Sequence, residues 1–91
     1  MGLKSTTTCL GYQQITSLTS STALTVPAGA TLALIVPEGQ MVRWRDDDVA
    51  PTAGVGMPVL PNASLSYDGD LRKLRFIESS ASAKLNVAYY A

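Results

Sequence analysis

The sequence predicts an all-β protein: a small, jelly-roll-like β-sandwich of about eight short strands in two similar halves. Two observations favour this fold. The five prolines, and most of the seven glycines, break the chain every few residues between positions 27 and 69. Proline removes a backbone donor and glycine permits positive φ, so both favour turns and strand ends over helices. The runs between these breaks are short and rich in residues that favour strands, which is typical of a sandwich or barrel.

Eight runs between the breaks are expected to form strands: 12–18, 23–26, 31–36, 40–45, 55–59, 64–67, 71–78 and 84–90. Residues 40–45, 71–78 and 84–90 alternate with a period of two, as half-buried strands do. Residues 31–36 are nearly all apolar, which predicts burial on both faces or a place in a subunit interface. Gly69 marks a tight turn at 67–70, where it would adopt a positive φ.

An internal sequence similarity, called the echo below, suggests that the chain has two similar halves. Residues 26–32 (VPAGATL) resemble 60–65 (LPNASL), and residues 42–46 (VRWRD) resemble 74–78 (LRFIE). Two four-stranded halves packed face to face would give a small jelly roll. Trp44 and Phe76 occupy matching places, which favours a shared core over an aromatic binding platform.

Length and composition limit the classes of function. The 91 residues make one domain, expected over 11–91, after a polar N-terminal arm over 1–10. A domain of this size has a marginal core, and Cys9 is the only cysteine, so no intrachain disulfide can form. Association with other subunits is the expected source of additional stability. The absence of histidine removes imidazole-based catalysis and histidine-based zinc sites, and no cofactor is predicted.

The charge pattern argues against a nucleic-acid partner. The formal net charge is zero, and the basic residues have acidic neighbours rather than forming a basic stripe. No apolar run approaches the ~20 residues that a membrane-spanning helix needs, so no membrane partner is predicted.

The acidic residues of two turns are the strongest candidates for chemistry. If the turn containing Asp46, Asp47 and Asp48 met the turn containing Asp68 and Asp70, the carboxylates would offer oxygen ligands to calcium. The EF-hand spacing is absent, and a solvated turn after the strand explains the run equally simply, so no metal is predicted. Paired acids in a hydrolase need a deep cleft, which so small a sandwich can hardly provide; we therefore predict no enzymatic activity.

Four segments resemble a known group of proteins. They are residues 42–58 (VRWRDDDVAPTAGVGMP), 67–71 (YDGDL), 74–78 (LRFIE) and 82–87 (SAKLNV). Together they resemble small, mostly uncharacterised structural proteins of tailed bacteriophages and prophages, over nearly the whole chain from Gly11 to Tyr90. The resemblance implies a virion component encoded among the head and tail genes, and it supplies no catalytic residues.

The sequence and this resemblance lead to one functional prediction. The chain is expected to be a non-enzymatic virion protein that decorates or cements the capsid, associates with itself and binds other virion proteins such as the major capsid protein. It would lie in the virion, and in the host cytoplasm during assembly. A tail, neck or fibre component, or a carbohydrate-binding module for host attachment, are the alternatives. The residues expected to make the interactions are Arg43, Arg45, Asp46, Asp47, Asp48, Asp68 and Asp70.

Overall fold

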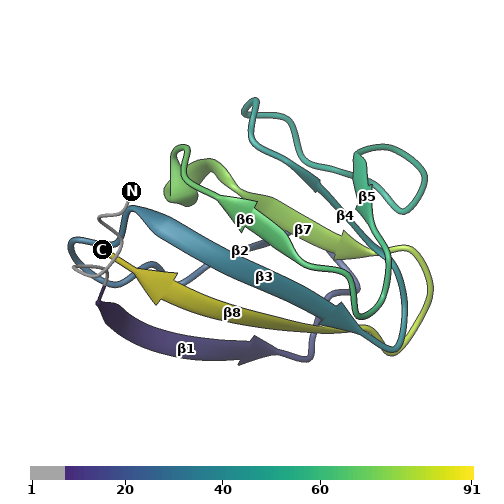
Figure 1. Ribbon diagram of the computed structural model, residues 1–91. Helices are drawn as coiled ribbons and strands as arrows, with labels where there is room; N and C mark the ends of the chain where they lie inside the picture. Colours follow the sequence, from purple (N-terminus) through teal and green to yellow (C-terminus); the bar gives the residue numbers. More distant parts are fainter. Residues whose placement is uncertain (1–7) are drawn as a thin grey trace.

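The computed structural model, which describes residues 8–91, is an all-β sandwich of two antiparallel four-stranded sheets (Figure 1). In chain order its elements are β1 (Cys9–Ile15), β2 (Thr22–Ala23), β3 (Leu32–Glu38), β4 (Val42–Arg45), β5 (Met57–Val59), β6 (Leu65–Tyr67), the 3-10 helix η2 (Leu71–Lys73), β7 (Arg75–Glu78) and β8 (Lys84–Tyr90).

The order of strands is that of a jelly roll. One sheet has the order β1-β8-β3-β6 and the other β2-β7-β4-β5, so the first strand pairs with the eighth, the second with the seventh, the third with the sixth and the fourth with the fifth. Such a double sheet wound from one long folded ribbon defines the jelly-roll architecture. The predicted fold class is confirmed.

The two halves do not form separate sheets, and here the sequence prediction needs correction. Each sheet takes two strands from each half, because the echoed strands pair with each other: β3 with β6, and β4 with β7. Trp44 lies directly opposite Phe76 in that second pair. The echoed turns also match, since Gly29 (φ 84°) and Asn62 (φ 68°) take the same left-handed position before β3 and β6.

The core lies between the sheets, where the inward side chains of the alternating strands meet. β8 directs Leu85, Val87 and Tyr89 inward, each at most 1% exposed. Opposite them lie buried residues of β4 and β7 and of the segments beside them: Leu18, Val42, Leu71, Leu74 and Phe76. The alternation predicted for 84–90 is therefore confirmed.

The β3 strand differs from its predicted burial. Ala33 and Ile35 are fully buried, whereas Leu34 points outward and is 37% exposed. The strand is thus buried on one face only, because no element of residues 8–91 covers the outer face of its sheet (Figure 1). The alternative expectation, a subunit contact at this strand, stays a prediction.

Several predicted boundaries shift for identifiable reasons. β1 starts at Cys9 because its ladder with β8 reaches Tyr90, so two residues of the expected N-terminal arm belong to the sandwich; residues 1–7 lie outside the described part of the chain. The predicted strand over 71–78 begins instead with η2. Asp70 caps this helix, its carboxylate accepting a hydrogen bond from the Arg72 N–H at 3.1 Å.

Candidate functional site

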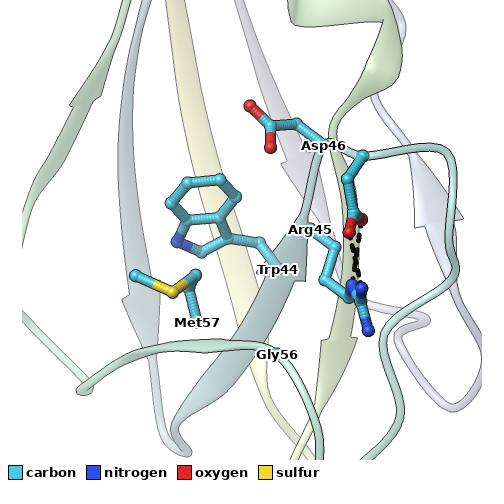
Figure 2. Close-up of a pocket in the computed structure, with 6 residues that line it drawn as sticks. Trp44, Arg45, Asp46, Gly56 and Met57 are labelled. Atoms are coloured by element: carbon cyan, nitrogen blue, oxygen red, sulfur yellow. Dashed lines mark hydrogen bonds and ion pairs between the residues drawn. The ribbon is translucent and has the colours of Figure 1, made fainter.

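The candidate site is an open groove where β4 leaves its sheet. Its volume is about 470 Å³, and we call it the Trp44 groove. Figure 2 shows the indole of Trp44 beside the Met57 side chain, with the carboxylate of Asp46 on the other side of the ring. The lining residues are Trp44, Arg45, Asp46, Asp47, Gly56 and Met57.

The position of Trp44 follows from the alternation along β4. Val42 points into the core and is fully buried, and Trp44 lies on the same face two residues later, where the sandwich opens. Its ring packs edge-on against Tyr67, with centroids 5.7 Å apart and planes at 72°. Phe76 is buried as predicted, whereas Trp44 is only half-buried because it occupies the end of the core.

A hydrogen bond between Tyr67 and Asp46 joins the two sheets beside the groove. The Tyr67 hydroxyl, on β6, donates to Oδ2 of Asp46, which directly follows β4. This bond to a carboxylate, with partial burial as the second cause, raises the pKa of Tyr67 to about 12. Gly69 completes the arrangement, since a Cβ there would lie 2.5 Å from the Tyr67 hydroxyl oxygen. The sequence predicted a positive φ at Gly69, but its φ is not positive. Glycine is needed here because the Tyr67 side chain leaves no room for a Cβ.

Arg45 and Asp47 form a two-pronged ion pair on the rim of the groove. Nε and Nη2 of Arg45 donate to the two carboxylate oxygens of Asp47 at 2.9 and 2.5 Å. The hydrogen bonds lower the pKa of the Asp47 carboxyl and raise the pKa of the Arg45 guanidinium. Both side chains are solvated, so the pair fixes the shape of the turn more than it stabilises the fold.

Arg43 supports the loop that forms the far wall of the groove. Its Nε donates to the carbonyl of Ala53, and its Nη1 to the carbonyl of Gly56, both at 3.1 Å. Gly56 has a φ of 145°, and a Cβ there would come within 3.0 Å of the Arg43 Cβ. Predicted as an interaction residue, Arg43 has its guanidinium engaged within its own chain, and it contributes by holding the loop in place.

The two acidic turns do meet at one end of the sandwich, as the calcium hypothesis required. Their carboxylates, however, bind donors of the protein: Asp46 binds Tyr67, Asp48 lies 3.3 Å from the ammonium of Lys73, and Asp70 caps η2. Asp68 is exposed. Within residues 8–91, no three acidic or cysteine side chains gather closely enough to hold a metal ion.

Within residues 8–91, the segment from 46 to 60 also carries most of the large exposed apolar side chains. Val49, Val55, Met57 and Leu60 are each at least 50% exposed. In Figure 1 the loop that joins β4 to β5, which makes up most of this segment, projects beyond the strands at the top of the view. We call residues 46–60 the projecting segment; its apolar side chains and charged rim have the composition of a protein-binding surface.

Sequence reasoning identified part of this site. Arg45, Asp46 and Asp47, which were predicted to make interactions, line the groove, whereas Gly56, Met57 and the contact of Tyr67 with Asp46 were not predicted. Tyr67 and Asp46 are distant in sequence, and only their placement on the two sheets brings them together. A pairing of residues 42–45 with 57–59 would have indicated Met57, because Trp44 and Met57 are partners in that ladder.

Comparisons with protein family models, with curated proteins and with solved structures found no match to this chain. In the described residues, no helix has the length and apolar character needed to cross a membrane.

Proposed function

We propose that this chain is a non-enzymatic structural protein of a bacteriophage virion, which associates with itself and decorates the capsid. The observation that carries the proposal is the projecting segment, which presents apolar side chains on a loop held by internal contacts. Arg43 holds its second part through two carbonyls, and the Arg45–Asp47 pair holds its beginning. A loop ordered before binding loses little conformational entropy on docking, which favours affinity.

The resemblance to small phage structural proteins supplies the partner. It covers nearly the whole chain, including residues 42–58, which contain most of the projecting segment. Under this proposal the major capsid protein contacts Val49, Val55 and Met57, and the charged rim of Arg45, Asp47 and Asp48 sets the orientation. Rim charges of this kind contribute to specificity and association rate more than to affinity.

Reconstitution tests the docking surface. Particles from a phage that lacks the gene are mixed with purified protein, and the bound copies are counted at increasing concentrations. Replacing Met57 by Asp buries a charge in the interface, so the variant should bind at least about tenfold more weakly. Ser66→Asp, an exposed change on the other sheet, is the matched control and should bind like the wild type. Equal binding by all three proteins would contradict a docking surface at the projecting segment.

The same experiment separates the head from the tail, neck and fibre alternatives. Labelled protein that decorates the head in electron micrographs supports the capsid role. Label confined to the neck, tail or fibres would assign the protein to that part of the virion instead.

One observation favours a second candidate function, carbohydrate binding for host attachment. Trp44 is half-buried at the floor of an open groove, with Asp46 and Asp47 as hydrogen-bonding groups beside it. Trp44 is the only tryptophan, so its fluorescence reports on the groove. A saturable change in fluorescence with host glycans would support this function, and a spectrum unchanged by them would exclude it in favour of the structural role.

A further inference from the structure

The two sheets have four edge strands, and three of them are protected against pairing with another chain. β2 has two residues, β5 has three and includes Pro58, and β6 has three. Short strands and prolines are the usual means by which natural sheets avoid contact between their edges. The fourth edge, β1, is longer than these, with seven residues.

β1 is long, uncharged and accessible along one side. Its seven residues, CLGYQQI, contain no proline and no ionisable group except the thiol of Cys9 and the phenol of Tyr12. Within residues 8–91, it pairs with β8 along one side only, and its other side borders no strand of its sheet (Figure 1). A bulge between Cys9 and Gly11 interrupts the N-terminal end of the strand, and the stretch from Gly11 to Ile15 is regular. An edge of this kind is a template for an additional strand.

The strand is also fixed in position before any partner arrives. The inward side chain of Gln13 accepts hydrogen bonds from the Tyr89 hydroxyl at 2.6 Å and from the Thr25 N–H at 3.1 Å. On the outer face, Tyr12 and Gln14 both donate to the carboxamide oxygen of Asn86, at 2.5 and 3.0 Å. Little ordering is therefore needed for the free edge to accept a partner strand.

We infer that β1 pairs with β1 of a second copy of this chain, antiparallel and about a twofold axis, to form a dimer with a continuous eight-stranded sheet. An antiparallel pair of identical strands is self-complementary, so one surface serves both partners. No charged side chain of β1 would face its copy, whereas many of the chain's charges lie around the projecting segment.

The side chains next to this edge suit such a pair. On β1 itself, Tyr12 is 64% exposed and Leu10 is 37% exposed. Pairing about a twofold axis within Gly11 to Ile15 would place Tyr12 and Gln14 of each copy beside those of the other. Aromatic and amide side chains in cross-strand contact stabilise such a pair, and like charges at the same places would oppose it.

The inference specifies the self-association within the proposed function, although the dimer would form whether or not the protein is found in virions. Light scattering on the purified full chain should give twice the mass of one chain. Replacing both Tyr12 and Gln14 by Lys places positive charges opposite each other, and this variant should have the mass of one chain. The matched control replaces Ser64 and Ser66 by Lys near the opposite edge of the same sheet, and should remain a dimer.

Hydrogen exchange on the wild-type chain gives a second readout that needs no substitution. Amides of β1 should exchange more slowly as the protein concentration rises, while those of β6 should not change.

A wild-type protein with the mass of one chain and no such concentration dependence would overturn the inference. A trimeric mass, or a dimer that survives the Tyr12→Lys and Gln14→Lys changes in folded protein, would overturn the β1 surface while leaving self-association intact. Detection in virions tests the proposed function independently.

Discussion

Tyr67 is the residue on which several features of the structure depend. Its hydroxyl donates to Asp46, its ring packs against Trp44, and its position leaves no room for a Cβ at residue 69. A single side chain thus connects β6 with the end of β4 and shapes one side of the Trp44 groove. Its sequence neighbours, Asp68 and Gly69, indicate a turn, but the cause of the glycine is steric exclusion by the aromatic ring.

Gly69→Ala tests this steric argument. The new methyl group would lie 2.5 Å from the Tyr67 hydroxyl oxygen, so the ring or the turn must move. We expect the free energy of unfolding to fall by about 1–3 kcal/mol, as for other overpacked sites. Gly54→Ala is the control, because nothing lies within 4 Å of its Cβ position. Urea denaturation measures both variants, and equal stabilities would refute the argument.

Asp46→Asn tests the electrostatic part of the same contact. Removing the negative charge should bring the pKa of Tyr67 down from about 12 toward its ordinary value of 10.0. The weaker hydrogen bond should also cost about 1 kcal/mol of stability. Ultraviolet titration, with Tyr67→Phe used to identify the signal, measures the shift. Asp47→Asn should leave the pKa of Tyr67 unchanged, because Asp47 pairs with Arg45 instead; an equal effect of both variants would contradict the assignment.

At the scale of elements, Arg43 holds the second part of the loop between β4 and β5 in place. Arg43→Lys should loosen residues 51–56, because a lysine ammonium cannot reproduce the fork that binds two carbonyls at once. We expect faster amide exchange in this loop and a loss of about 1 kcal/mol in stability. Arg72→Lys, at an exposed position in η2, is the control. Exchange rates that do not differ between the two variants would show that Arg43 does not support the loop.

The elements also show where sequence patterns succeed and where they fail. Alternation identified β8 and the inward positions of β7 correctly, because burial on one face of a sheet imposes a period of two. The same rule failed at residues 71–74, where Asp70 offers a cap to η2, a local signal that competes with the strand pattern. Thr16 to Leu18 leave the sheet because Leu18 turns into the core and its carbonyl accepts the Glu78 N–H at 3.0 Å.

At the scale of the whole molecule, the titration of two tyrosines should lower the stability of the fold at alkaline pH. The pKa of Tyr67 is about 12 because of Asp46, and the pKa of Tyr89 is about 12 because of burial; the ordinary value is 10.0. A raised pKa means that folding favours the protonated phenol. The associated stabilisation is therefore complete below about pH 10 and is lost as the pH rises toward 12. Chemical denaturation across this range should show the decline, and Tyr67→Phe should reduce it; a flat profile would contradict both pKa shifts.

The sequence predicted the fold class but not how the halves combine. Proline, glycine and alternation revealed eight strands, and the echo between Trp44 and Phe76 correctly marked related strands. The echo could not show that the related strands pair with each other, since pairing depends on the path of the chain between the sheets. The Trp44 groove was only partly predicted for the same reason, because contacts such as Tyr67 with Asp46 arise when the two sheets pack.

The central proposal, that this jelly roll is a component of a phage virion, is tested most directly by quantitative mass spectrometry of purified, intact phage particles released by cells that carry its gene. The account predicts that the protein is present in a fixed ratio to the major capsid protein. Its absence from intact particles, in cells where the protein is produced, would contradict the account.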